Sequence, residues 1–183
     1  MPDTDGARTA RYFCAQLQAG VAPMPWVYLY DEPGGTYKST LLALTLRHWI
    51  VNGGGGLIVG WKDFLRDIRS TYDHDAMESE AAMLEQIIEA PALVLDDVGV
   101  GDLTQFDAEM FYAVLQRRLE RDLEAGGKRW MGMTSNYSVA ELVQRYAAAP
   151  EDKRSNGRLR DPRMRTRIER RLVDATAEVH MLG

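Results

Sequence analysis

The sequence predicts an α/β fold, a three-layer sandwich with a central, mostly parallel five-stranded sheet and helices on both faces. Short apolar runs alternate with longer amphipathic stretches from residue 26 onward, which is the pattern of strand-helix units. The run Ala92-Leu93-Val94-Leu95 is apolar at every position, as strands covered on both faces are. Two predicted strands end in polar residues, and ligands of parallel sheets bind at that edge. We therefore expect a ligand site at the carboxyl ends of the strands.

The first third of the chain contains two predicted helices and two predicted strands. Apolar residues at helical spacing predict a helix over 7–20, ended by a glycine before two prolines. Trp26–Tyr30 is an apolar run and predicts the first core strand. The stretch 38–51 is apolar on nearly all sides, which predicts a helix enclosed by its neighbours. A glycine-rich turn over 52–56 ends that helix, and 57–60 is predicted to be a short buried strand.

The remaining elements follow from the same signals. Helical spacing predicts helices over 62–72 and 78–89, after which Pro91 introduces a strand over 92–97. Apolar rows at four-residue spacing predict a long amphipathic helix over 104–123, ended by two glycines. A strand over 130–134 follows, and Ser138 with Glu141 forms a capping-box pattern for a helix over 139–148. A helix over 168–174 and a final strand over 178–182 complete the prediction.

The size of the chain, 183 residues, fits one domain of ordinary size. We expect a helix and linker over 1–25 and a single core over 26–183. The single Cys14 has no partner within the chain for a disulfide, the start of the chain lacks a signal pattern, and no apolar run reaches about 20 residues. These features favour a cytoplasmic protein.

The charge is unevenly distributed along the chain. The net charge is −5, but the stretch 153–171 carries nine basic residues against two acidic ones, a local +7 that leaves −12 for the rest. This asymmetry indicates a basic face presented to an anionic partner. A solvated arginine-rich loop is the alternative.

The segment Asp31-Glu32-Pro33-Gly34-Gly35-Thr36-Tyr37-Lys38-Ser39-Thr40 joins the first strand to the next helix. A glycine-bearing loop that ends in Lys-Ser-Thr at a helix start is typical of a phosphate-binding loop. We expect backbone amides to hold phosphates, Lys38 to bridge the outer phosphates, and Ser39, or Thr40 in its place, to bind Mg²⁺. The candidate phosphate-binding residues are Gly34, Gly35, Thr36, Tyr37, Lys38, Ser39 and Thr40.

The loop departs from the standard G-x-x-x-x-G-K-[ST] pattern in two places. Without a gap, Glu32 stands in place of the first glycine; with a one-residue insertion, Asp31 does. Either alignment brings a carboxylate near an anion site and weakens phosphate binding unless the carboxylate points away. Tyr37 stands immediately before the lysine. The alternative to a working nucleotide site is therefore a decayed loop in an adaptor without enzymatic activity.

Two further strand ends supply polar groups to the same edge. Asp96 and Asp97 end a buried strand, and we expect Asp96 to hold Mg²⁺ through water and Asp97 to polarise the attacking water. Asn136 follows the next strand, where it is placed to contact a terminal phosphate. The alternative for the aspartates is a turn-capping role only.

Phosphoryl transfer is accelerated by an arginine that neutralises developing charge, often from a neighbouring subunit. Arg167 and Arg171 lie four residues apart on one predicted helical face. Arg117 and Arg118 on the long helix are weaker candidates. Surface solvation is the alternative for each.

Taken together, these motifs resemble the AAA+ P-loop ATPases of the DnaC/DnaI helicase-loader and IstB transposition-helper type. The residues that carry the resemblance span Trp26 to the end of the chain, and they are Val27-Tyr28-Leu29-Tyr30, Ala92-Leu93-Val94-Leu95-Asp96-Asp97-Val98-Gly99, Gln116-Arg117-Arg118, Thr134-Ser135-Asn136 with Ala140-Glu141-Leu142, and Arg167-Ile168-Glu169-Arg170-Arg171-Leu172. The double aspartate is the most distinctive of them.

The resemblance implies ATP and Mg²⁺ as cofactors, slow ATP hydrolysis, and ATP-dependent assembly of several copies into a ring or spiral. It also implies that Asn136 is the first sensor, that Arg171, or Arg167, acts on a neighbouring subunit, and that 61–72, with Lys62, Arg66 and Arg69, lies near single-stranded DNA. A replicative helicase is the expected partner; for an IstB-like helper the partner would be a transposase and duplex DNA. Two departures are an N-terminal segment too short for a helicase-binding domain and an apparent insertion over 147–165.

Overall fold

The computed structural model describes residues 26–31, 37–71, 79–126, 129–149 and 163–180, together with positions 8, 12 and 15; for 174–180 it describes the backbone only. Most of the predicted helix over 7–20, most of the phosphate loop and the first half of the basic stretch lie outside the described residues. Among the described residues, no helix combines the length and the apolar character needed to cross a membrane.

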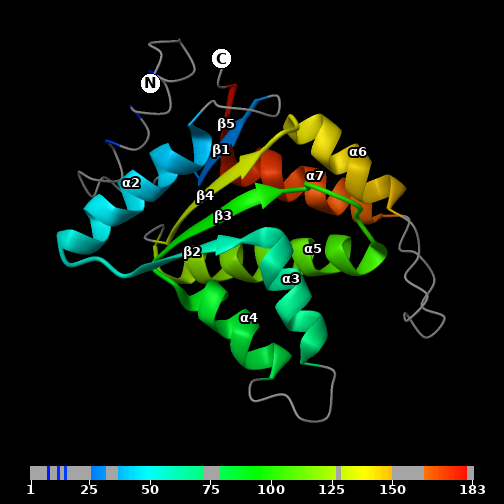
Figure 1. Cartoon of the computed structure of the whole chain (residues 1–183), viewed down its shortest axis with the longest axis horizontal. Coiled ribbons are helices and arrows are strands. Elements are labelled where there is room, and N and C mark those ends of the chain that lie inside the picture. The colour runs from blue at the N-terminus through cyan, green and yellow to red at the C-terminus, as the bar shows by residue number, and fades with distance from the viewer. Residues whose placement is uncertain are drawn as a thin grey trace.

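The centre of the molecule is a parallel sheet (Figure 1), with five strands in the described residues in the order β2-β3-β4-β1-β5. All of the strand pairs in this order are parallel, which confirms the predicted sheet. The strands are β1 (Trp26–Tyr30), β2 (Gly56–Gly60), β3 (Ala92–Val98), β4 (Trp130–Ser135) and β5 (Thr176–His180). The carboxyl ends of β1, β3 and β4 therefore lie side by side at the centre of one edge.

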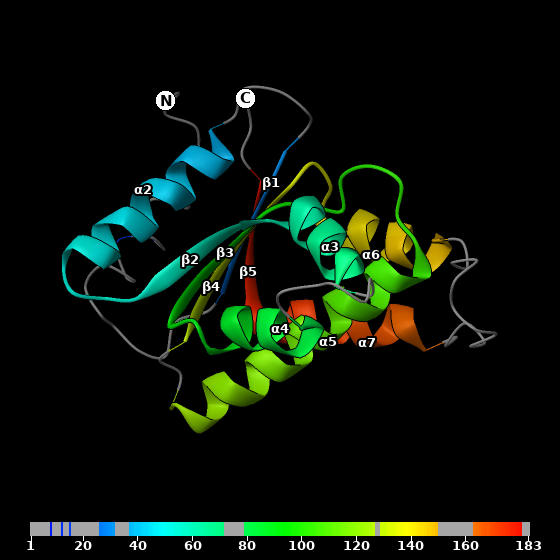
Figure 2. The ribbon, with the colours of Figure 1, turned by 60° about the horizontal axis from the view of Figure 1, so that its bottom comes forward.

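Helices cover the two faces of the sheet unequally (Figure 2). In strand β1, alternate side chains point to opposite faces, so that Val27 and Leu29 contact the helix that follows the phosphate loop while Trp26 and Tyr28 contact the others. The first face is covered by α2 (Lys38–Val51). The second is covered by α3 (Trp61–Ser70), α4 (Glu80–Glu89), α5 (Gln105–Glu124), α6 (Val139–Ala148) and α7 (Met164–Ala175).

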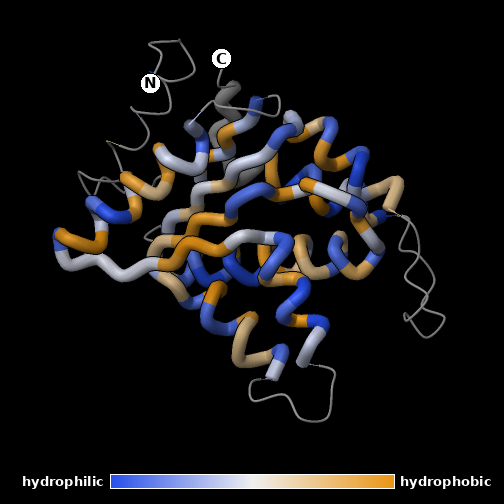
Figure 3. Tube along the Cα trace, in the orientation of Figure 1, coloured by the Kyte–Doolittle hydropathy of each residue, from blue (hydrophilic) through white to orange (hydrophobic). Residues whose placement is uncertain are grey.

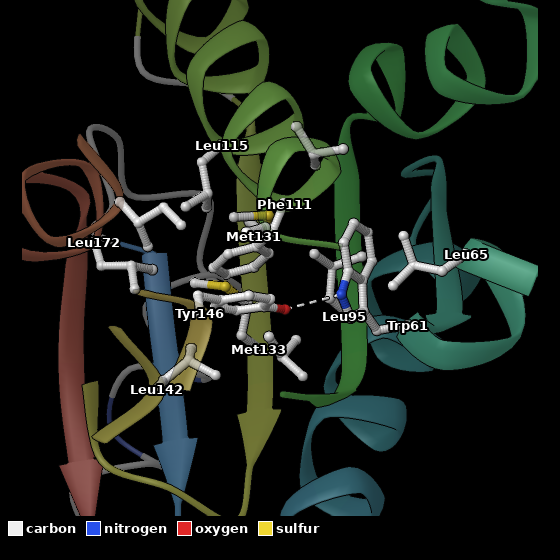
Figure 4. Close-up of a cluster of buried hydrophobic side chains, with 14 of the residues drawn as sticks. Trp61, Leu65, Leu95, Phe111, Leu115, Met131, Met133, Leu142, Tyr146 and Leu172 are labelled. Atoms are coloured by element: carbon white, nitrogen blue, oxygen red, sulfur yellow. Dashed lines mark hydrogen bonds between the residues drawn. The ribbon is translucent and has the colours of Figure 1, made fainter. Parts of the chain in front are cut away.

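The larger core lies on the second face, and aromatic rings occupy its centre (Figure 4). Phe111 of α5 stacks on Tyr146 of α6, with ring centroids 4.9 Å apart, and Trp61 and Phe111 form a T-shaped pair. The Trp61 indole N–H donates to the Tyr146 hydroxyl at 3.1 Å. This bond satisfies two polar groups that burial would otherwise leave unpaired. It also joins the start of α3 to α6.

Local signals account for where several helices begin. Ser138 and Glu141 form the predicted capping box of α6, and their hydrogen bonds lower the pKa of the Glu141 carboxyl. Thr104 and Asp107 form a second capping box at the start of α5. It does not match the usual sequence pattern, because Asp stands where Glu or Gln is usual.

Two burial predictions were wrong. Strand β2 is an edge strand, and Leu57 and Ile58 are exposed rather than buried. Figure 3 shows the hydrophobic character of this strand in orange. Helix α2 packs on the sheet through Leu41, Leu42 and Leu46, but Leu44 is 55% exposed, so the helix is not enclosed. Both errors have one cause: burial depends on strand order and on what packs outside an element, which local apolar content does not encode.

Candidate functional site

A buried threonine brings the ends of β3 and β4 together with the start of α2. The Ser39 hydroxyl donates to Asp96 Oδ1 at 2.6 Å, and the Thr134 hydroxyl donates to the same oxygen at 2.6 Å. Thr134 is fully buried and Asp96 is half-buried. Hydrogen bonds to a carboxylate in such a partly desolvated place are strong and fix its orientation. The predicted Ser39 and Asp96 therefore do meet at the carboxyl edge of the sheet, whereas Thr40 is exposed.

Asp97 lies at an irregularity of the sheet. The pairing of β3 with β4 shifts register between Leu95 and Val98, and Asp97 adopts a left-handed backbone with φ 57°. Its backbone N–H donates to the Thr134 hydroxyl at 2.9 Å. The bulge turns the Asp97 side chain out of the regular strand pattern, and a non-glycine residue in this region stores strain that the surrounding bonds must hold. Thr134 thus orients both carboxylate residues.

Asp97 interacts electrostatically with both Asp96 and Lys38 at this edge of the sheet. Burial and then the negative charge of Asp96 raise the pKa of the Asp97 carboxyl, while the charge of Lys38 acts in the opposite direction. Both effects have the expected sign, since desolvation and a like charge disfavour the ionised form. A carboxyl with a raised pKa is better suited to accept a proton than an ordinary surface aspartate.

Lys38 is buried at the first position of α2, and its ammonium group donates to the backbone carbonyl of Asp31 at 3.4 Å. Tyr37, just before it, has a left-handed backbone with φ 60°, and its side chain is half exposed. Glycine adopts this conformation at no steric cost, so Tyr37 keeps the backbone shape that a glycine would give here. Asp31 is buried, and Glu32, Gly34, Gly35 and Thr36 lie outside the described residues.

The turn that carries Asn136 is held from several sides. The backbone N–H of Tyr137 donates to the Ser135 hydroxyl, which donates to Val98 O at 2.7 Å, and the Tyr28 hydroxyl donates to Tyr137 O at 2.7 Å. Asn136 is half-buried in this turn, at the end of β4 next to β3. The sheet therefore brings the predicted Asn136 to the same edge as Asp96 and Asp97.

The structure does not gather the candidate arginines at this cluster. Arg167 and Arg171 lie on α7, on the face of the sheet opposite α2 (Figure 2). The Arg167 guanidinium lies 5.7 Å from the centre of the Tyr112 ring on α5. Any action of these arginines on a phosphate at Lys38 is therefore more compatible with a second copy of the chain.

The other two candidate arginines have structural contacts. Arg118 is fully buried and donates to Ile87 O, Ile88 O and Trp130 O at 2.6–3.1 Å, so it closes the end of α4. Burial, and next the charge of Arg129, lower its pKa to about 9. Arg117 pairs with Glu85 at 2.6 Å. The idea that Arg118 reaches a neighbouring subunit was wrong, because the side chain faces the interior.

The basic residues of α3 are also partly engaged within the chain. Arg69 donates to Asp107 at 2.6 Å and lies 4.9 Å from the centre of the Phe106 ring. Arg66 lies between Asp63 and Asp67. Lys62 is exposed. The surface of α3 is therefore less basic than its arginine and lysine content indicates.

The donor set at the cluster fits Mg²⁺ bound together with a triphosphate. No group of three or more His, Cys, Asp or Glu side chains that could hold a metal ion occurs in the described part of the chain. A hydroxyl and one carboxylate, Ser39 and Asp96, meet instead. Mg²⁺ prefers such oxygen ligands and usually takes one or two of them from the protein, with water and substrate phosphates completing the shell.

The fold is that of the AAA+ P-loop NTPases, and the comparisons with solved structures agree on this. A crystal structure of DnaI superposes with a TM-score of 0.73 at 21% sequence identity, covering 100% of this chain and 85% of that one. A crystal structure of the DnaC helicase loader gives 0.71 at 17% identity, covering 100% and 93%. The replication initiator DnaA bound to AMPPCP and single-stranded DNA gives 0.68 at 14% identity, covering 98% and 47%.

Within this class, the resemblance to DnaC is also found in sequence. The chain is 25% identical over 115 residues to the replicative helicase loader DnaC of Buchnera aphidicola subsp. Baizongia pistaciae, covering 63% of this chain and 44% of that protein. It is 22% identical over 135 residues to DnaC of Escherichia coli K12, covering 74% and 51%. The match thus spans about half the length of these relatives, and no family model matches the chain. The chain therefore resembles the DnaC/DnaI-type AAA+ proteins in both sequence and fold.

Proposed function

We propose that the chain binds ATP with Mg²⁺ at the Ser39, Asp96 and Thr134 cluster and hydrolyses it slowly. The observation that carries the proposal is the 2.6 Å contact of the Ser39 hydroxyl with Asp96, at the start of a helix and beside Lys38. A helix start next to a lysine favours phosphate oxygens. AMPPCP in the DnaA structure of similar fold is a second support.

Each residue has a proposed role. Lys38 and the amides of Gly35 to Ser39 hold phosphates, with Gly34 shaping the loop and Thr40 as the alternative hydroxyl. Ser39 and Asp96 hold Mg²⁺, which when bound neutralises phosphate charge. Asp97 accepts a proton from the attacking water, for which its raised pKa suits it. Asn136 contacts the terminal phosphate.

We further propose that several copies assemble with ATP, and that Arg171, with Arg167 as the second candidate, contacts the phosphates bound by a neighbouring copy. The position of α7 on the face opposite α2 supports an action between copies rather than within one. An arginine supplied in this way stabilises the charge that develops during phosphoryl transfer.

The proposed biological role is that of a cytoplasmic DnaC-like loader in DNA replication, acting on a replicative helicase and on single-stranded DNA. The names of the relatives support the helicase, and the exposed arginines Arg165, Arg167 and Arg170 of α7, with Arg163 just before it, support an anionic partner. Two alternatives differ from this role. An IstB-like helper would act with a transposase instead of a helicase, and an adaptor would not hydrolyse ATP.

Fluorescent ATP binding with and without Mg²⁺ tests the proposed site. Replacing Lys38 by Ala should raise the Kd at least tenfold, because about 1.4 kcal/mol of phosphate interaction corresponds to a factor of ten. Arg47→Ala is the matched control, since Arg47 is an exposed cation on the same helix and its loss should leave the Kd unchanged. Equal and negligible binding by wild type and Lys38→Ala would instead support the adaptor.

Binding of labelled single-stranded and duplex DNA at several salt concentrations distinguishes a helicase loader from a transposition helper. A helicase loader should prefer single strands when ATP is present and should co-purify with a replicative helicase. Tight duplex binding that weakens steeply with salt, without a helicase, would favour the transposition helper.

A further inference from the structure

Arg145 of α6 contacts two separate loops at the edge of the site. Its Nη2 donates to Gly101 O at 2.8 Å and its Nε to Gly99 O at 3.3 Å, in the loop that follows Asp97. The same guanidinium lies 4.2 Å from the centre of the Tyr137 ring, in the turn that follows Asn136. One planar group thus joins the loop after β3 to the turn after β4.

The two joined segments are short extensions of the proposed catalytic residues. Gly99 lies two residues beyond Asp97, and Tyr137 directly follows Asn136. A displacement of either segment therefore changes the separation between the Asp97 carboxyl and the Asn136 amide. The buried Ser135 hydroxyl also joins these two segments, because it donates to Val98 O and accepts from the Tyr137 N–H. Arg145 joins the same segments at a second place.

The loop after Asp97 rests directly on α6 at this point. A Cβ placed on Gly99 would lie 2.2 Å from Leu142 Cδ1, and the residue has φ +81°. Only glycine allows both this backbone conformation and this approach. Leu142 is three residues before Arg145, so one helix face supplies both the packing surface and the guanidinium.

We propose that Arg145 is a positioning residue for ATP hydrolysis: it holds the loop after Asp97 and the turn after Asn136 at a fixed separation, so that both side chains reach the same terminal phosphate. This inference rests on the proposed function. It extends that function to a residue that acts through the loop after Asp97 and the turn after Asn136.

The contacts explain why arginine is needed rather than any cation. A planar guanidinium donates to two carbonyls at once and stacks on a ring with its face. A lysine ammonium carries the same charge but has no such plane, so it cannot hold both segments together. Arg145→Lys therefore separates the geometric role from the charge.

The test compares steady-state ATP hydrolysis and nucleotide affinity for wild type, Arg145→Met and Arg145→Lys. Both variants should lower kcat about 10- to 100-fold, since misplacement of a reacting group by about 1 Å costs up to that much. The Kd for ATP should change less than about threefold, because the contacts of Arg145 within the described residues are with Gly99, Gly101 and Tyr137 rather than with Lys38. Amide hydrogen exchange of 97–101 and 136–138 should rise in both variants without nucleotide.

Arg129→Met is the matched control. Arg129 is another partly buried arginine, which donates to the carbonyl and carboxylate of Glu89, but it lies just before β4 begins, at the opposite edge of the sheet. Wild-type kcat in Arg145→Lys, or an equal loss of kcat in Arg129→Met, would overturn the inference. If the wild type does not hydrolyse ATP, the proposed activity fails in that assay. Amide hydrogen exchange then decides the positioning role, and the role is refuted if the Arg145 variants exchange at 136–138 as the wild type does.

Discussion

Replacing Thr134 by Val tests whether one hydroxyl organises the carboxylates of the site. Valine keeps the shape of the side chain but removes the group that donates to Asp96 Oδ1 at 2.6 Å and accepts from the Asp97 N–H at 2.9 Å. Thr134 is fully buried, so no water replaces its hydroxyl without rearrangement. The substitution therefore removes these two contacts and little else.

The expected cost follows from the two bonds. A hydrogen bond to a charged group is worth about 1.5–3 kcal/mol and a neutral one about 0.5–1.5 kcal/mol. The bond to the Asp96 carboxylate is of the charged kind and the bond from the Asp97 N–H is of the neutral kind, so we expect a loss of about 2–4 kcal/mol in the free energy of unfolding. Urea denaturation followed by circular dichroism measures this loss as a shift in midpoint at constant slope.

Thr45→Val is the matched control for this experiment. Thr45 is also buried, but its hydroxyl donates only to the Leu41 carbonyl within α2, at 2.9 Å. Loss of that neutral bond should cost about 1 kcal/mol or less. Our account of Thr134 is refuted if the two valine variants lose stability within about 0.5 kcal/mol of each other.

Three more outcomes are expected. Asp97→Asn should be more stable than wild type at neutral pH, because the folded state raises the pKa of this carboxyl and so penalises its charge. The difference should shrink as the pH falls through the raised value toward 3.8, where the wild-type group is protonated; urea titrations between pH 4 and 7 measure it, and a constant difference contradicts the assignment. Gly99→Ala should cost about 2–5 kcal/mol from backbone strain and the clash with Leu142. Gly126→Ala has similar strain at φ +70° but open space and should cost about 1–2 kcal/mol, so equal costs would exclude the clash. Arg118→Met should lower the free energy of unfolding by at least about 3 kcal/mol, since three carbonyls lose a charged donor. Arg117→Met removes only a surface pair and should cost less than about 1 kcal/mol in the same thermal or urea unfolding; similar losses would contradict the capping role.

Most of the candidate site could be predicted from the sequence because its signals are local. Two of these signals are the glycine-bearing segment before Lys38 and the pair of aspartates after an apolar run. Each can be recognised once the neighbouring strand and turn have been predicted. Parallel strands then place Ser39, Asp96 and Asn136 at one edge, whatever the details of packing. The roles of Thr134 and Arg145 were missed, since a Thr inside a strand and an Arg on a helix carry no motif of their own.

Apolar periodicity, capping residues and glycine-rich turns by themselves determined where strands and helices form and that the sheet is parallel. These features act between residues that are close in the chain, so they can be read from it directly. Only the tertiary structure decided that β2 lies at an open edge, that Arg118 faces the interior while Arg117 faces outward, and that Thr134 and Arg145 join separate loops. Those outcomes depend on contacts between residues that are distant in the chain, such as Arg118 with Trp130, 12 positions away, and Arg145 with Gly99, 46 positions away. The geometry of such contacts is set only when the whole sheet and its helices pack together.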